Sequence, residues 1–199
     1  MPAGAEAPER FPSLLDQRPL TRRALAFATL RHRGQRRTSD SAPFILHPLE
    51  VAHLLHGRGL PDEVVAAGVL HDTVEDAQVP IGELRVHFGE RIAALVGAVT
   101  EPEREGPYRE RKAALRAEVE AAEDDAVAIY AADKVAKVRE LRMALAAGDG
   151  AMSAEKREHY MASLEMLERR LPGHPLVRQL RFELETLEYL PPRRGWPGF

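Results

Sequence analysis

The sequence predicts an all-α protein, a compact multi-helix bundle around one core. Apolar residues recur at helical spacing through most of the chain, and no segment alternates between apolar and polar residues over a useful length. Helix-start signals also recur, with prolines, acids or small polar residues ahead of the apolar runs. With 199 residues, the chain can bury one core of ordinary size, and no internal repeat is evident.

The first helix is expected to begin near residue 20. Leu20 and Phe27 share an apolar face, Thr21 is placed to help start the helix, and Gly34 is placed to end it. The polar stretch 35–42 that follows predicts a loop.

Prolines and acids mark the next two helices. Pro48 suits the first turn of a second helix that runs to about Gly57. Pro61 and the two acids after it open a third helix, because acids stabilise the positive end of a helix. The stretch 64–70 of this helix is apolar on all sides, so we expect it to be central.

Further helices follow to the end of the predicted domain. They are expected over residues 81–88, 90–99, 108–121, 125–147, 153–171 and 174–190, with Ser153 as a cap. We expect residues 1–18 to form a disordered leader and 19–190 a single domain. Residues 191–199 are expected to form a flexible tail, because their prolines lack the amide donor that a helix needs.

The composition excludes several classes of protein. A net charge of -3 argues against a general nucleic-acid-binding protein, which would be basic. Cysteine is absent, so any metal must be held by His, Asp or Glu. No apolar run approaches the ~20 residues that cross a bilayer, and the N-terminus lacks the pattern of a secretory signal. We expect a cytoplasmic protein, monomeric or homo-oligomeric, without membrane or nucleic-acid partners.

The densest polar cluster runs from His71 to Asp76, at the end of the most apolar helix. On a helix, residues four apart share a face, which would align His71 with Glu75 and Asp72 with Asp76. Acids at the C-terminal end of a helix are unfavourable, and like charges this close repel one another. A polycation or a bound metal is the usual compensation, and we favour the metal, so the cluster predicts a metal site.

Two isolated polar residues could complete that site. His47 precedes a proline at a helix start, and Asp133 interrupts an apolar run in an otherwise buried helix. Each has an ordinary explanation alone, as a helix-entry histidine or as a core aspartate paired with a nearby lysine. Together with His71 and Asp72 they offer two nitrogens and two oxygens, which suit Mn²⁺, Fe²⁺ or Zn²⁺ better than Ca²⁺.

The motifs resemble those of a known family, the HD-domain metal phosphohydrolases with their H…HD…D signature. The resemblance is strongest to the RelA/SpoT-type hydrolase domain and its stand-alone relatives, the small alarmone hydrolases. The matching strings run in order over roughly residues 20–145. They are His32-Arg33-Gly34-Gln35-Arg36-Arg37, Pro43-Phe44-Ile45-Leu46-His47-Pro48, Leu70-His71-Asp72-Thr73-Val74-Glu75-Asp76, Phe88-Gly89, Val99-Thr100, Glu110-Arg111-Lys112 and Ala132-Asp133-Lys134-Val135-Ala136-Lys137-Val138-Arg139-Glu140-Leu141.

The resemblance implies an enzyme and a site. It implies hydrolysis of the 3′-diphosphate of guanosine tetra- or pentaphosphate, with release of pyrophosphate. Glu75 and Asp76 would be the catalytic acid/base residues. One Mn²⁺ would be held by His47, His71, Asp72 and Asp133.

Substrate contacts are also implied by the resemblance. Arg37 would stack on the base, and Phe44 stands where the family usually has a tyrosine. Lys156 and Tyr160, one helical turn apart, resemble a pair that reaches the nucleotide from the C-terminal helices. Lys137 replaces a family asparagine that contacts the nucleotide, so the preferred base stays open.

Several alternatives remain open. The same site could act on another 3′- or 2′-phosphorylated nucleotide, such as an adenine alarmone analogue or NADPH, or the chain could be a catalytically silent nucleotide-binding module. His53 and His56, three residues apart, could bind a second metal, but no carboxylate at helical spacing completes that set. The sequence has no phosphate-cradling glycine loop and no serine elbow, which argues against kinases, dehydrogenases and esterases.

Overall fold

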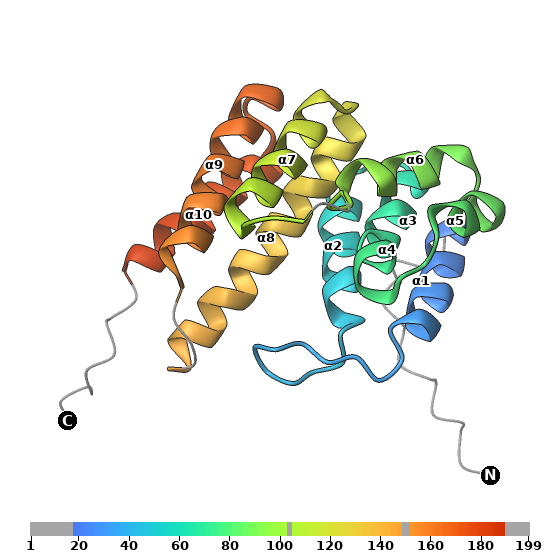
Figure 1. The fold of residues 1–199 in the computed structure, drawn as a ribbon, viewed down its shortest axis with the longest axis horizontal. Coiled ribbons are helices and arrows are strands. Elements are labelled where there is room, and N and C mark those ends of the chain that lie inside the picture. The colour runs from blue at the N-terminus through green and yellow to red at the C-terminus, as the bar shows by residue number, and fades with distance from the viewer. Residues whose placement is uncertain (1–17, 103–104, 149–151, 190–199) are drawn as a thin grey trace, which may run out of the picture.

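Figure 1 shows the computed structural model of the chain, which describes residues 18–102, 105–148 and 152–189. Within these residues the regular structure is helical, apart from an isolated antiparallel bridge between Arg36 and Pro43. The predicted all-α class is therefore confirmed. Of the predicted leader and tail, all but residue 18 lies outside the described residues, and the domain limits stay predictions.

Apart from α4, which was not predicted as a separate helix, the helices agree with the predicted ones to within a few residues. In order, they are α1 (Pro19–Arg31), α2 (Leu46–His56), α3 (Asp62–Leu70), α4 (Thr73–Ala77), α5 (Ile81–Phe88), α6 (Glu90–Val99), α7 (Tyr108–Ala121), α8 (Asp124–Ala146), α9 (Ala154–Arg170) and α10 (Pro175–Glu188). Ser153 caps α9 as predicted, since its side chain accepts a hydrogen bond from the Lys156 amide at 3.2 Å. Among the described residues, no helix combines the length and apolar character needed to span a membrane.

Helix α3 lies at the centre of the first group of helices, as its uniformly apolar sequence predicts. It packs against α1, α2, α6 and α8, and its residues from Val64 to Leu70 are buried. The contact with α2 is close because Gly68 has no side chain: a Cβ there would lie 2.4 Å from Leu55 Cδ1. This close approach places the end of α3 beside α2.

Helix α8 joins the two halves of the molecule. Figure 1 shows it crossing diagonally between α1 to α6 on one side and α7, α9 and α10 on the other. Its stretch 126–136 is buried, and it contacts both groups of helices. Polar side chains in that stretch are therefore held inside the protein, and Asp133 among them faces His47 and His71 from the first half of the chain.

Thr21 does not cap its own helix, which corrects the prediction. Asp62, the first residue of α3, caps α1 instead: its carboxylate accepts hydrogen bonds from the amides of Leu20 at 2.9 Å and Thr21 at 3.1 Å. The Thr21 hydroxyl donates to the same carboxylate. A carboxylate satisfies unpaired amides at a helix start better than a hydroxyl, so the partner in α3 takes this role.

The polar run after Leu70 is not one continuous helix either. Helix α3 ends at Leu70, and the separate short helix α4 begins at Thr73. Two side chains take up carbonyls at the end of α3, because Thr73 Oγ1 donates to Leu70 O at 2.6 Å and His71 Nδ1 bonds Gly68 O at 2.8 Å. His71 and Asp72 therefore lie in the turn between the two helices.

Candidate functional site

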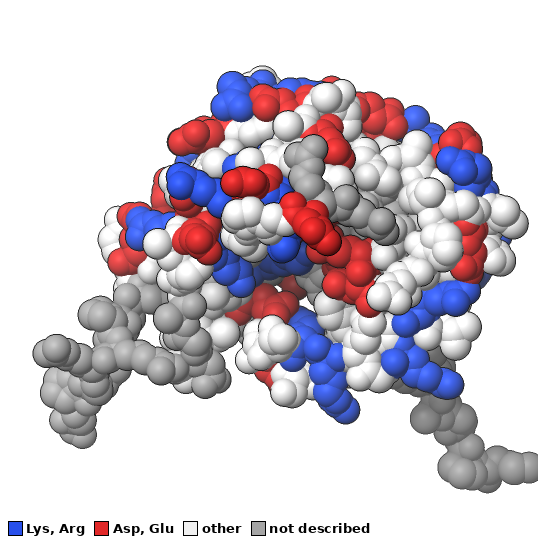
Figure 2. Space-filling model, in the orientation of Figure 1, with Lys and Arg blue, Asp and Glu red and all other residues white. Residues whose placement is uncertain are grey.

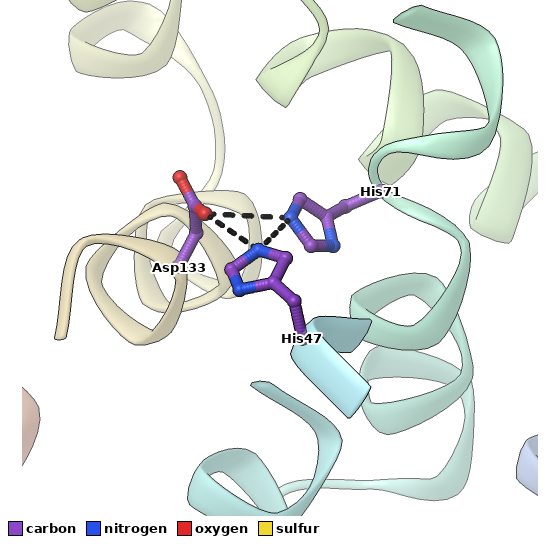
Figure 3. Close-up of side chains that lie close together, drawn as sticks. All are labelled: His47, His71 and Asp133. Carbon is purple, nitrogen blue, oxygen red and sulfur yellow. Dashed lines mark hydrogen bonds and ion pairs between the residues drawn. The ribbon is translucent and has the colours of Figure 1, made fainter. Parts of the chain in front are cut away.

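Three predicted ligands from distant parts of the chain meet at the α2–α3–α8 junction. Figure 3 shows His47 of α2, His71 of the turn after α3 and Asp133 of α8 pointing toward one another, with their ligand atoms all within 4.8 Å. His47 Nε2 and His71 Nε2 are 3.3 Å apart. Asp133 Oδ1 lies 3.2 Å from His47 Nε2 and 3.4 Å from His71 Nε2. This geometry suits one shared cation.

Asp72 adds a fourth donor to these three. Its Oδ2 lies 3.2 Å from His47 Nε2 and 3.1 Å from His71 Nε2. All four side chains are buried, yet neither Asp72 Oδ2 nor Asp133 Oδ1 has a partner with hydrogen-bond geometry, although Lys137 Nζ forms an ion pair with Asp133 Oδ1 at 3.0 Å. Buried oxygens without a partner are costly, and these two face imidazole nitrogens of a set that ligates transition metals. The residues therefore fit a divalent metal ion.

The tautomer of His71 follows from its second ring nitrogen. Nδ1 lies 2.8 Å from the carbonyl oxygen of Gly68, which can only accept, so Nδ1 carries the proton. In the neutral ring the lone pair is therefore on Nε2, which faces the other candidate ligands. The same bond that ends α3 therefore orients a metal ligand.

The charges of the ligand set are strongly coupled when no cation is present. Burial lowers the pKa of His71, but the neighbouring Asp72 and Asp133 outweigh it and raise that pKa to about 10. Burial raises the pKa of Asp72, but His71 and Lys137 outweigh it and hold it well below its ordinary value. The carboxylates are therefore ionised, and protons or lysines balance them until a cation takes their place.

The predicted catalytic pair, Glu75 and Asp76, is exposed on α4, directly after the ligand turn. Burial, then the negative charges of Asp72 and Glu75, raise the pKa of Asp76. Gln35 Nε2 donates to the Asp76 carbonyl at 2.8 Å, which ties α4 to the loop before α2. His32 lies in the same network, bonded to Gln35 Oε1 at 2.7 Å, and is not among the clustered ligands.

A cavity of about 760 Å³ opens beside the ligand set, with His47 in its wall. Figure 2 shows this face hollowed between α8 and the loop before α2, with Lys and Arg side chains inside the hollow. The structure brings every predicted substrate residue to its lining: Arg37, Phe44, Lys137, Lys156 and Tyr160. The predicted catalytic residues Glu75 and Asp76 are not in that lining.

The lining residues hold each other in place. Phe44 packs between His32 and His47, with ring centroids 4.8 and 6.0 Å away. Arg37 Nε donates to Asp40 at 3.0 Å, and its Nη1 lies 3.7 Å from Glu140 of α8. Arg37 is therefore engaged with acids of the loop and of α8 as well as facing the pocket.

The lining also includes residues that the sequence did not mark as substrate contacts, among them Tyr108, Lys112 and His159. Lys112 lies in a motif string and so had a signal, whereas Tyr108 and His159 have none, because only tertiary packing brings them to the cavity. Burial and then the charges of Lys134 and Arg116 lower the pKa of His159 to about 2. Arg116 Nη1 donates to His159 Nδ1 at 2.8 Å, so this imidazole is neutral.

The alternative metal pair finds no support in the described part of the chain. His53 and His56 are exposed on α2, with ring centroids 6.5 Å apart. Within residues 18–102, 105–148 and 152–189, the side chains that cluster as metal ligands are those of His47, His71 and Asp133.

Comparison with known proteins decides the family. The family described as HD domain matches residues 24–160. The chain belongs to the HD-domain family. An HD domain implies a divalent metal, for which His47, His71 and Asp133 form a candidate site.

Similar proteins place this HD domain more narrowly. Human guanosine-3′,5′-bis(diphosphate) 3′-pyrophosphohydrolase MESH1 is 34% identical over 175 residues, covering 86% of this chain and 93% of that protein. The mouse protein of the same name is 38% identical over 121 residues, which is 59% of this chain and 67% of that protein. The predicted resemblance to the small alarmone hydrolase class is confirmed.

A solved structure agrees with the fold of this HD domain. It is that of a metazoan orthologue of SpoT described as hydrolysing ppGpp, with a TM-score of 0.72 and 24% sequence identity. The match covers 89% of this chain and 98% of that one. The predicted HD-type helical bundle is therefore confirmed.

Proposed function

We propose that the chain is a metal-dependent hydrolase that removes the 3′-diphosphate of guanosine tetra- or pentaphosphate as pyrophosphate. The observation that carries this proposal is the meeting of the buried ligand set with a pocket lined by cationic side chains. A nucleotide with two polyphosphate groups requires such concentrated positive charge. The relatives named as 3′-pyrophosphohydrolases, which match most of the chain, support the same substrate.

The metal would be Mn²⁺, one per chain, with Fe²⁺ or Zn²⁺ as alternatives. When bound, such an ion supplies Lewis-acid polarisation of a phosphoryl oxygen and lowers the pKa of water. The residues that would hold it are His47, His71, Asp72 and Asp133. The two buried oxygens without hydrogen-bond partners support this assignment.

Glu75 and Asp76 would handle the protons. Attack of water on the phosphorus next to the ribose 3′-oxygen requires a base for the water proton and an acid for the leaving oxygen. Asp76 has a raised pKa and so holds a proton to higher pH than an ordinary aspartate, which suits the acid role. Glu75, its exposed neighbour, would then act as the base.

The pocket residues would bind the nucleotide. Lys137 and Lys156 offer point charges to phosphate oxygens, and Arg37 offers a planar guanidinium to the base. Burial raises the pKa of Tyr160, so its phenol keeps its proton and can donate a hydrogen bond. Phe44 supplies an apolar wall beside His47.

The decisive experiment is a nucleotide panel assay. The purified chain with Mn²⁺ is incubated with the guanosine tetraphosphate, its adenine analogue and NADPH, and pyrophosphate and phosphate release are measured. We expect pyrophosphate release from the guanine alarmone. A chain with bound Mn²⁺ that leaves this alarmone intact would contradict the proposed substrate, and turnover of another panel member would assign that one instead.

The Glu75→Ala variant separates an enzyme from a silent binding module. We expect turnover to fall by on the order of 10²-fold or more, because proton transfer is lost, while one Mn²⁺ per chain is still bound. Glu118→Ala, which removes an exposed acid of α7, is the matched control and should keep full turnover. Unchanged turnover in Glu75→Ala would remove Glu75 from the mechanism.

A further inference from the structure

Two lysines of α8, Lys134 and Lys137, contact the carboxylate of Asp133, each at a different oxygen. Lys134 Nζ lies 2.7 Å from Asp133 Oδ2, which points away from the imidazoles, and it is buried over the Tyr130 ring. Lys137 Nζ lies 3.0 Å from Asp133 Oδ1, the oxygen that approaches both imidazole nitrogens. Lys137 also lies 3.7 Å from Asp72 Oδ1.

Lys137 is more exposed than Lys134 and so can move away from Asp133 more easily. Both lysines line the pocket, but the side chain of Lys137 is 39% exposed, whereas that of Lys134 is 6% exposed. A lysine ammonium is a flexible point charge at neutral pH. It can therefore pair with the ligand carboxylates in one state and turn toward the pocket in another.

We propose that Lys137 competes with the metal ion for Asp133 and Asp72, and that metal binding releases it to the phosphate pocket. The inference rests on the proposed metal centre and concerns its regulation. An ammonium and a divalent cation repel each other strongly at the separation that a shared carboxylate oxygen imposes, so both cannot bind Asp133 Oδ1 at full strength.

The competition also couples metal to substrate. Once Lys137 is displaced, its charge adds to that of Lys112 and Lys156 in the pocket lining. An anion bound there stabilises the displaced lysine and thereby favours metal binding, and by linkage the metal favours the anion to the same degree. The chain would thus hold its metal more firmly when phosphate is present.

Metal affinity, measured from the electron paramagnetic resonance signal of free Mn²⁺, tests the competition. We expect Lys137→Met to bind Mn²⁺ on the order of tenfold more tightly than the unaltered chain, because a repelling charge is removed. Lys137→Arg, which keeps the charge, should stay close to the unaltered chain. Lys156→Met, the matched control, removes a pocket charge for which the structure shows no contact with the ligand carboxylates and should change affinity far less.

Two further measurements follow from the same competition. Metal-free Lys137→Met should unfold at a lower temperature than the unaltered chain, since Asp133 and Asp72 lose a counter-charge, and Mn²⁺ should raise its midpoint by more. Inorganic phosphate should increase the Mn²⁺ affinity of the unaltered chain, and it should increase that of Lys137→Met by less. Both affinities are corrected for the Mn²⁺ that phosphate itself binds.

The outcomes separate this inference from the proposed function. If the unaltered chain binds one Mn²⁺ and Lys137→Met binds it no more tightly, the competition is refuted and the metal centre stands. If Lys156→Met tightens Mn²⁺ binding as much as Lys137→Met does, the effect comes from the total positive charge of the pocket and not from a contact of Lys137. The competition is then also refuted. If neither the unaltered chain nor Lys137→Met binds Mn²⁺, the metal centre falls and the inference with it.

Discussion

The two ring nitrogens of His71 have separate tasks. Nδ1 bonds the carbonyl of Gly68 and helps end α3, and Nε2 faces His47, Asp72 and Asp133. A single side chain thus takes up a carbonyl at the end of α3 and is also placed to serve as a metal ligand. Orientation by a backbone acceptor is a common feature of metal-binding histidines.

Replacing His71 by Ala should abolish stoichiometric Mn²⁺ binding. The variant loses a nitrogen donor and leaves Asp72 and Asp133 without a neighbour that balances their charge in the metal-free state. Equilibrium dialysis with metal analysis measures the loss, and circular dichroism checks that the helices persist. His53→Ala, an exposed histidine of α2, should bind Mn²⁺ as the unaltered chain does. Retention of one tightly bound Mn²⁺ by His71→Ala would contradict the site.

At the scale of elements, the packing of α2 on α3 controls the distance between His47 and His71. Gly68 allows the two helices to approach, since a Cβ there would lie 2.4 Å from Leu55 Cδ1 and 3.4 Å from Val51 Cγ1. Leu55 and Val51 are themselves fully buried and have no free space to move into. The absence of a side chain at one position therefore supports the ligand geometry.

Gly68→Ala should therefore destabilise the protein by about 1–3 kcal/mol, because the added methyl group overpacks the interface. Its Mn²⁺ affinity should also fall, because α3 and His71 move relative to α2. Urea unfolding and metal titration measure the two effects. Gly82→Ala is the control: no atom lies within 4 Å of a Cβ there, so this helical site should gain up to about 1 kcal/mol. Equal stability of Gly68→Ala and the unaltered chain would disprove the packing argument.

The connection between α6 and α7 is held by a charge pair. Glu101 lies 2.7 Å from Arg111 Nε and pairs with Lys112 Nζ. Burial raises the pKa of Glu101, but Lys112 and Arg111 outweigh it and hold it below its ordinary value. Because the folded pKa is the lower one, this stabilisation is present above the unfolded pKa and is lost as pH falls through the folded pKa.

Glu101→Gln should therefore lower the free energy of unfolding at pH 7, by up to about 1 kcal/mol for a partly exposed pair. The difference from the unaltered chain should vanish once acid has protonated Glu101 in the folded state. Urea unfolding at a series of pH values measures it. Glu105→Gln, in the same connection, serves as control. A difference that persists unchanged into acid would show that the charge of Glu101 is not its cause.

At the scale of the whole molecule, the proposed metal ligands join segments that are distant in the chain. His47 comes from α2, His71 and Asp72 from the turn before α4, and Asp133 from α8, which contacts both groups of helices. An unfolded chain cannot present these donors together. Metal binding therefore favours the folded state over the unfolded one.

Mn²⁺ should raise the thermal midpoint of the full chain and a chelator should reverse the rise. At a free concentration 100 times the Kd, the stabilisation is about 2.7 kcal/mol, which corresponds to roughly 5–10 °C for a chain of this size. Differential scanning calorimetry measures it. Asp133→Asn should lose most of the shift. A midpoint that does not respond to Mn²⁺, in a sample that binds the ion, would contradict a site shared between distant helices.

Most of the helices and of the candidate ligand residues could be predicted, because the sequence patterns that indicate them are local. Apolar spacing predicts the helices within a few residues, and the apolar stretch 64–70 predicts the central position of α3. The ligand residues were recognisable because a histidine and an aspartate stand together where a buried helix ends, and because Asp133 interrupts an apolar run. Such patterns depend on residue types at short spacing.

What the sequence by itself determined is the set of helices, apart from the break that separates α4 from α3, and the donors available to a metal. Only the tertiary structure decided that Asp62 caps α1, that His159 reaches the pocket, and that Lys137 contacts Asp133 Oδ1. The physical reason is the distance along the chain between the residues that interact. Helix formation follows from neighbours one or two turns apart, whereas these contacts depend on how whole helices pack, and packing is settled by the shape of the complete core.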